Sequence, residues 1–189
     1  MFDRWNSIWI SGLALFAVFA AAALAGCENP AWQEEVSESL PAMGHRNWIV
    51  VADAAYPYQS RDGVTTVMTG GKQLSVVRKV LQAIEKSPHV RPKVYLDAEL
   101  AHVPESQARG ITSYRSALNA ILDGRDVEAM PHEDLIARLD EAANTFRVLV
   151  LKTKTALPYT SVFIQLDCGY WSPEAEAELR RAMSGDAAP

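Results

Sequence analysis

Short apolar runs rich in β-branched residues alternate along this chain with longer segments in which apolar residues recur at helical spacing. The run 48–52, Trp-Ile-Val-Val-Ala, lies between polar and turn-forming residues, a pattern typical of a buried strand. On the same criteria, strands are predicted over residues 48–52, 64–68, 93–97, 126–130, 146–151 and 161–166. Helices are predicted over 34–43, from the turn at 69–72 to residue 86, and over 104–122, 132–144 and 173–183. Strands that alternate with helices predict a single layered α/β domain of the α/β/α kind, with a largely parallel or mixed sheet.

The first 26 residues differ in composition from this domain. Residues 10–25 form an almost unbroken apolar stretch, and the sequence Leu-Ala-Gly-Cys at 24–27 places small residues before a cysteine. The stretch is typical of a secretory signal and is short for a spanning helix. Leu-Ala-Gly-Cys also fits the bacterial lipobox, which predicts cleavage before Cys27, lipidation of its thiol and anchoring of an exported protein at an envelope membrane, on the periplasmic side or the outer surface. A plain transmembrane anchor is the alternative.

The mature chain is expected to be one domain. The predicted organisation is a signal peptide, a tether, a domain and a tail over residues 1–26, 27–34, 35–184 and 185–189. About 160 residues are enough for a single domain with a real core. A formal charge of −5 gives no electrostatic footprint for nucleic acid or anionic lipid. The chain has two cysteines, so with Cys27 lipidated Cys168 has no partner and no intrachain disulfide is expected.

Two titratable side chains lie on either side of the run 48–52, His45 before it and Asp53 after it. In α/β proteins ligands gather at the carboxyl ends of strands, so Asp53 stands where a polar site is expected. A surface histidine and a turn-forming or capping aspartate are the alternative interpretations. The histidines of the chain lack zinc-ligand spacing, and neither a Gly-x-Ser-x-Gly elbow nor a cysteine nucleophile with a placed base is found in the sequence. The chemistry that remains is acid–base work without a metal or a cofactor.

Three segments of the sequence carry a resemblance to a known family. In the segment 44–57, Gly-His-Arg-Asn-Trp-Ile-Val-Val-Ala-Asp-Ala-Ala-Tyr-Pro, Gly-His leads into an apolar strand that ends in Asp-Ala and a proline-containing loop. Residues 158–161, Pro-Tyr-Thr-Ser, are similar to a Pro-Tyr-x-Asn motif, and residues 114–118, Tyr-Arg-Ser-Ala-Leu, to a Tyr-Arg-Asn-Ala-Leu helix. Over residues 35–167 the chain resembles the D-ribose pyranase / L-fucose mutarotase (RbsD/FucU) family, in particular its fucose branch.

The resemblance implies an activity and roles for individual residues. Members of the family have the same α/β class, assemble into rings and interconvert the anomers or ring forms of a free sugar without a cofactor. By resemblance, His45 is the proton-transferring group, a role that suits a side chain able to exchange a proton near neutral pH. Asp53, His132, Tyr159 and Ser161 are the implied sugar-binding residues. The chain is accordingly expected to be a sugar isomerase, a mutarotase or pyranase for a fucose- or ribose-like monosaccharide.

The spacing of His45 and Asp53 limits how they can act together. At about 3.3 Å per residue, an extended strand between them separates the two side chains by well over about 15 Å, too far for one monosaccharide to bridge. Either the loop before the strand folds back, or the two residues meet across a subunit boundary. The ring assemblies of the family favour the second arrangement, so a homo-oligomer with sites at its interfaces is expected.

Departures from the family pattern leave other functions open. Ser161 stands where the family has asparagine and reaches less far, and Asn47 stands where relatives often carry aspartate. Export is also unusual for enzymes that serve sugar catabolism inside the cell. The alternatives are a non-catalytic sugar-binding lipoprotein and a structural lipoprotein of the cell envelope.

Overall fold

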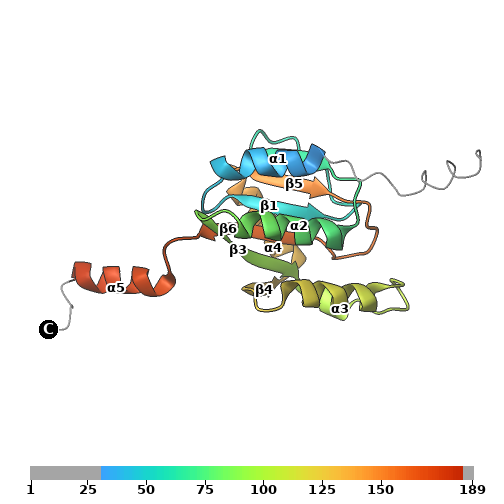
Figure 1. Ribbon diagram of the computed structural model, residues 1–189. Helices are drawn as coiled ribbons and strands as arrows, with labels where there is room; N and C mark the ends of the chain where they lie inside the picture. Colours follow the sequence, from blue (N-terminus) through green and yellow to red (C-terminus); the bar gives the residue numbers. More distant parts are fainter. Residues whose placement is uncertain (1–30, 185–189) are drawn as a thin grey trace, which may run out of the picture.

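The computed structural model describes residues 31–184. The predicted signal peptide, the predicted lipidation site Cys27, the first half of the predicted tether and the tail 185–189 lie outside the described residues, and the second half of the predicted tether belongs to helix α1. None of the helices within the described part combines the length and the apolar character that a membrane crossing needs. In chain order the elements are α1 (Ala31–Ser39), the 3-10 helix η1 (Leu40–Ala42), β1 (Trp48–Ala52), β2 (Val64–Met68), α2 (Gln73–Glu85), β3 (Val90–Asp97), the 3-10 helix η2 (Ala98–His102), α3 (Ile111–Leu122), β4 (Val127–Met130), α4 (His132–Ala142), β5 (Val148–Lys152), β6 (Val162–Cys168) and α5 (Pro173–Ser184) (Figure 1).

The strands form one six-stranded sheet in the order β2-β5-β1-β6-β3-β4. The pairs β1–β5, β2–β5 and β3–β4 are parallel, whereas β6 runs antiparallel to both of its neighbours, β1 and β3. The sheet is therefore mixed, with one reversed strand, and the predicted fold class is confirmed. Because β6 is reversed, its first residues lie at the same edge of the sheet as the last residues of β1 and β3.

Alternate residues of β1 pack into two hydrophobic core layers, one on each face of the sheet. Ile49 and Val51 pack with α1, α2 and α3 on one face, while Trp48, Val50 and Ala52 pack with α4 on the other face. All five are at most 1% exposed. Figure 1 shows α2 in front of the sheet and α4 behind it. Burial on both faces explains why this run is apolar throughout instead of alternating with polar residues.

The strand boundaries follow the sequence pattern most closely in β1, at the centre of the sheet, and in the edge strand β2. β1 and β2 cover the predicted residues 48–52 and 64–68. β3 starts at Val90, three residues before the predicted start at 93, because its first residues pair with the end of β6, where Val90 lies opposite Cys168. A cross-strand partner of this kind cannot be recognised from the local pattern.

The helix predicted over 104–122 is wrong at its start, because α3 begins only at Ile111. Gly110, just before it, has a φ of 93°, a left-handed conformation that a continuous right-handed helix does not contain. The preceding loop is held by Arg115, whose guanidinium donates hydrogen bonds to the carbonyl oxygens of Leu100 and Val103 at 3.0 and 2.8 Å.

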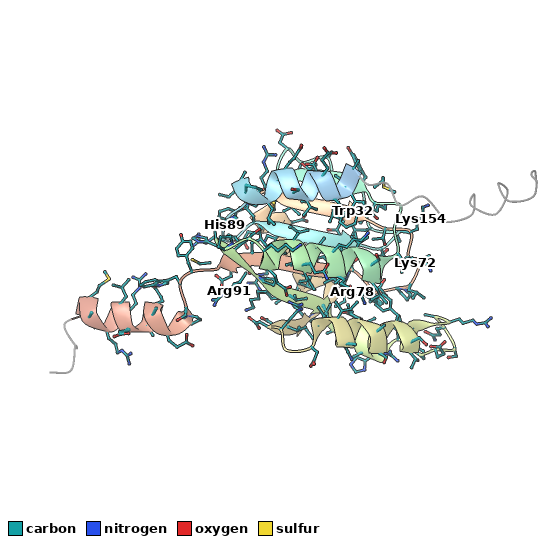
Figure 2. All side chains as sticks on the ribbon, viewed as in Figure 1. Trp32, Lys72, Arg78, His89, Arg91 and Lys154 are labelled. Atoms are coloured by element: carbon teal, nitrogen blue, oxygen red, sulfur yellow. The ribbon has the colours of Figure 1, made fainter. Side chains whose placement is uncertain are left out.

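His89 has a structural contact in this fold. Its Nε2 lies 3.2 and 3.1 Å from the carbonyl oxygens of Leu40 and Met43 and so links the end of η1 to the start of β3 (Figure 2). At the other end of the described chain, α5 extends from β6 away from the sheet, and none of its side chains is buried (Figure 1).

Candidate active site

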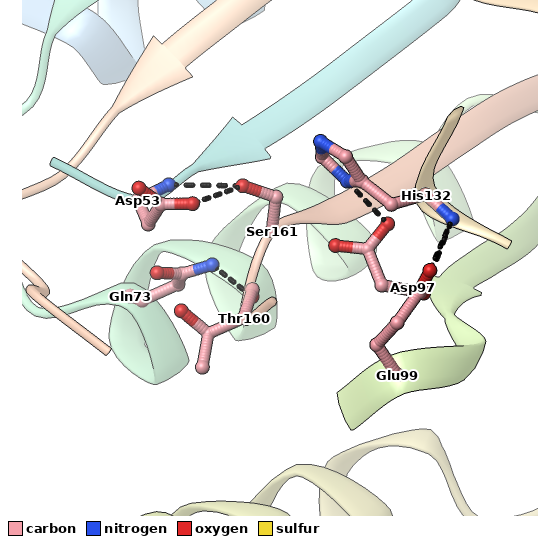
Figure 3. Close-up of polar contacts among 7 residues, drawn as sticks. All are labelled: Asp53, Gln73, Asp97, Glu99, His132, Thr160 and Ser161. Carbon is pink, nitrogen blue, oxygen red and sulfur yellow. Dashed lines mark hydrogen bonds and ion pairs between the residues drawn. The ribbon is translucent and has the colours of Figure 1, made fainter. Parts of the chain in front are cut away.

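Four polar side chains gather at the edge of the sheet where the parallel strands end (Figure 3). Asp53 follows β1, Asp97 is the last residue of β3, and Ser161 directly precedes the reversed strand β6. His132 is the first residue of α4, which follows β4, the parallel neighbour of β3. Strand order and direction thus bring together residues from distant parts of the sequence, at the edge where α/β sheets bind ligands.

Asp53 and Ser161 form a reciprocal pair. The Ser161 hydroxyl donates to Oδ2 of Asp53 at 2.9 Å, and the backbone N–H of Asp53 donates to the Ser161 Oγ at 3.1 Å. Oδ1 of Asp53 accepts a hydrogen bond from the backbone N–H of Ala55 at 2.7 Å. The contacts fix the carboxylate of Asp53 and commit the buried Ser161 side chain to holding it.

His132 is held by two acidic residues of the β3–η2 segment. Its Nδ1 lies 3.0 Å from Oδ1 of Asp97, and its backbone N–H donates to the two carboxylate oxygens of Glu99 at 3.0 and 3.1 Å. The Asp97 side chain is 1% exposed, whereas the His132 side chain is 33% exposed. A buried carboxylate therefore orients a ring that solvent or a ligand can reach.

The electrostatics of this pair follow from burial. Burial raises the pKa of Asp97, and the charges of Glu99 and Asp53 add to this effect, while the hydrogen bond and charge of His132 oppose it. The pKa of Glu99 is lowered, mainly because its carboxylate accepts the backbone N–H of His132. The residues Asp53, Ser161, Asp97 and His132 are called the polar cluster below (Figure 3).

Tyr159 adds an aromatic side chain to the cluster. Its ring meets that of His132 edge-on, with centroids 5.7 Å apart and planes inclined by 80°. The φ of Tyr159 is 56°, an uncommon conformation for a residue with a side chain and one that is often found at functional sites. The side chain is 39% exposed and can present its face or its hydroxyl to a ligand.

The loop that carries Tyr159 is held in place by hydrogen bonds from two buried side chains. The hydroxyl of Tyr114 donates to the carbonyl oxygen of Thr160 at 2.8 Å. Nε2 of Gln73 donates to the same oxygen (Figure 3) and, at 3.1 Å, to the carbonyl oxygen of Val51. Gln73 thereby connects the end of β1 to the residues that precede β6.

Two buried polar atoms beside the cluster have no hydrogen-bond partner within residues 31–184, namely Oδ2 of Asp97 and the hydroxyl of Tyr56. The pKa of Tyr56 is raised by burial and by the negative charges of Asp140, Asp97 and Asp53. The Tyr56 hydroxyl is therefore a buried hydrogen-bond donor in negatively charged surroundings.

His45 lies at the opposite end of β1. It is exposed in the turn 44–47, where the backbone N–H of Asn47 donates to the carbonyl oxygen of Gly44 at 3.2 Å. Burial acts to raise the pKa of Asp167, near the end of β6, but its ion pair with Arg91 at 2.6 Å and the charge of His45 lower it. The alternative in which the loop folds back to bring His45 to Asp53 is therefore wrong.

Four of the five predicted site residues thus meet at one edge of the sheet: Asp53, His132, Tyr159 and Ser161. His45 does not join them within one chain. Asp97 was not predicted from the sequence, although it is the last residue of a predicted strand and Asp53 directly follows another. Within residues 31–184, no group of three or more His, Cys, Asp or Glu side chains is placed to hold a metal ion.

Comparisons with known proteins agree with this architecture. The model of the RbsD / FucU transport protein family matches residues 28–169. In structure the chain is similar to RbsD from Bacillus subtilis, solved in complex with D-ribose, with 17% identity, a TM-score of 0.50 and coverage of 69% of this chain and 89% of that one. It is also similar to FucU from Bifidobacterium longum, with 16% identity, a TM-score of 0.45 and coverage of 70% and 92%. For the fucose mutarotase from Streptococcus pneumoniae, solved in complex with L-fucose, these values are 17%, 0.41, 68% and 87%.

No curated protein matches the chain significantly. The similarity to the Bacillus RbsD structure supports the fold, and the family match covers well over half of the sequence. The chain therefore belongs to the RbsD / FucU family.

Proposed function

We propose that the protein is a monosaccharide mutarotase or pyranase that interconverts the anomers or ring forms of a free sugar by acid–base catalysis without a cofactor. The observation that carries this proposal is the convergence of Asp53–Ser161, Asp97–His132 and Tyr159 at one edge of the sheet in a chain of this family. Because B. subtilis RbsD was solved with D-ribose, ribose is one of the first sugars to test, together with fucose.

The reaction needs only positioned donors and acceptors. A proton leaves the anomeric hydroxyl, another reaches the ring oxygen, and the ring opens and closes again on the other face. Acid–base groups that are held in place typically accelerate such steps by about 10²- to 10⁴-fold. In this site the carboxylate of Asp53 binds sugar hydroxyls, His132 faces the sugar from the start of α4, and Tyr159 supplies an aromatic surface.

The active form is a homo-oligomer, in the manner of the family's rings. Within one chain His45 is remote from the polar cluster, so a proton-transfer role for His45 requires that a neighbouring copy bring it to the site. Its exposure at the surface of a single chain leaves it accessible for such a contact.

Asp53→Asn is expected to lower anomer exchange by about 10- to 100-fold, because an amide cannot replace a charged acceptor of sugar hydroxyls. Exchange is measured by NMR saturation transfer between the anomers of ribose, fucose and galactose, with and without protein. Asp62→Asn, the same change at an exposed loop position, is the matched control and should leave exchange unchanged. Wild-type protein that accelerates exchange of none of these sugars would contradict the proposed activity.

A non-catalytic sugar-binding lipoprotein is the second candidate. It is favoured by Ser161, whose hydroxyl is occupied by Asp53 and which stands in the position of a longer asparagine in relatives. This function predicts sugar binding without accelerated exchange, whereas a structural envelope lipoprotein predicts neither.

The protein is further proposed to be exported and anchored at an envelope membrane through lipidated Cys27. Cys27→Ala should then move the protein from the membrane fraction to the soluble fraction of cells that express it, because the acyl chains supply the anchor. Fractionation followed by mass spectrometry of the wild-type N-terminal peptide measures this. A wild-type peptide without acyl groups would contradict lipidation.

A further inference from the structure

The Asp97–His132 pair has the geometry of a carboxylate that orients an imidazole for proton transfer. The carboxylate engages Nδ1 at 3.0 Å, and Figure 3 shows the second ring nitrogen directed away from Asp97. The backbone of His132 is fixed separately by Glu99, so both the main chain and the ring plane are determined. The edge-on contact with the Tyr159 ring restricts the imidazole of His132 from another side.

We infer that Asp97 is a positioning residue, which orients His132 as the acid–base group that each chain contributes to its own site. The inference rests on the proposed function. It extends that function with a second imidazole, in addition to His45, and with Asp97, which the sequence pattern did not identify.

The chemical reason lies in the tautomer of the ring. A carboxylate only accepts hydrogen bonds when ionised, so of the two neutral tautomers of the imidazole it selects the one with its proton on Nδ1 and a lone pair on Nε2. Nε2 can then take the proton of the anomeric hydroxyl as C1=O forms and the bond between C1 and the ring oxygen breaks. The ring oxygen receives a proton from a second acid, the imidazole of His45 from a neighbouring copy or water. Closure on the other face returns both protons, so the protein is unchanged after one turnover.

The surroundings of Asp97 indicate that it serves to orient the ring of His132 and not to stabilise the fold. The carboxyl is buried, and its Oδ2 has no partner among the described residues. Its raised pKa means that folding disfavours the ionised form relative to the unfolded chain, so its contribution to stability falls as the pH rises through that pKa. At pH 7, asparagine should therefore support the fold at least as well as aspartate does. In a merely structural role an ionised aspartate would have no advantage over asparagine.

The inference is tested with the variants Asp97→Asn and His132→Gln. The matched control is Asp134→Asn, which removes the same charge as Asp97→Asn but at an exposed position of α4, the helix that carries His132. Asp97→Asn should lower anomer exchange by at least about tenfold, with a thermal midpoint equal to or above that of the wild type. Asp134→Asn should leave exchange unchanged. In ¹⁵N spectra of the imidazoles, the signals that disappear in His132→Gln belong to His132. In the wild type they should show a single neutral tautomer protonated on Nδ1, and Asp97→Asn should broaden or redistribute them.

Several outcomes would overturn the inference. Wild-type spectra in which His132 is protonated on Nε2 would do so without any mutant, even if Asp97→Asn did not fold. Unchanged exchange and an unchanged tautomer in Asp97→Asn would also contradict it. Loss of exchange together with a lowered thermal midpoint and an unchanged tautomer would assign Asp97 a structural role. If the wild type accelerates no sugar exchange, the proposed function fails, but the tautomer comparison still decides whether Asp97 positions His132.

Discussion

Co-refolding equal amounts of the His45→Ala and Asp53→Asn chains, each strongly impaired alone, is expected to raise anomer exchange to about a quarter of the wild-type rate. The reason is that His45 and Asp53 lie beyond opposite ends of β1. If a site combines Asp53 of one chain with His45 of its neighbour, random assembly leaves about one site in four with both native residues. Saturation-transfer NMR measures the exchange, and native mass spectrometry confirms that mixed oligomers have formed.

The matched control uses two residues of the same cluster. His132 and Asp53 lie at one edge of the same chain, so mixing His132→Ala with Asp53→Asn leaves every site with one defect, and no exchange should return. Mixed oligomers of the first pair that stay inactive would show that His45 does not complete a neighbour's site. Recovery with both pairs would show that the cluster itself is shared between chains.

Gln73→Ala is expected to lower the free energy of unfolding by about 1–3 kcal/mol, since a buried polar group left unpaired costs about that much. Gln73 is 1% exposed and its amide donates to the carbonyl oxygens of Val51 and Thr160. Its Oε1 also accepts a hydrogen bond from the Thr153 hydroxyl at 3.4 Å. The substitution removes these hydrogen bonds, although the Thr160 carbonyl keeps that of Tyr114 and the Thr153 hydroxyl keeps the Ala52 carbonyl. It also weakens the contact between the ends of β1, β5 and β6 that supports Asp53 and Ser161.

Urea unfolding followed by circular dichroism measures the change, with Gln82→Ala as the matched control. Gln82 lies on the same helix with its side chain exposed, so its substitution should change the free energy of unfolding by no more than about 0.5 kcal/mol. Equal effects of the two substitutions would contradict the role assigned to the buried amide.

The local pattern predicted the fold class and most of the elements. The strands at 48–52 and 64–68 and the start of α4 at His132 agree with the structure, because β-branched runs and a proline before a helix are strong local signals. The start of α3 was missed because Gly110 adopts a left-handed conformation that the helical spacing of its neighbours concealed. The extra length of β3 depends on its pairing with β6, which is a tertiary contact.

The candidate site was predicted in part. Asp53 was identified from its place after a strand, whereas His132, Tyr159 and Ser161 were named through the family resemblance. Asp97 occupies an equivalent place at the end of β3 and could have been found by the same criterion. Its role, however, depends on a partner 35 residues away in the sequence.

The sequence by itself determined the α/β class, the family and the kinds of side chain available for the chemistry, because these depend on local periodicity and on short motifs. Only the tertiary structure decided that Asp97 holds His132, that Ser161 holds Asp53 and that His45 lies at the far end of β1. The physical reason is that periodicity specifies a strand but neither its neighbours nor its direction. The reversed β6 and the order β2-β5-β1-β6-β3-β4 are what bring these distant residues to one edge.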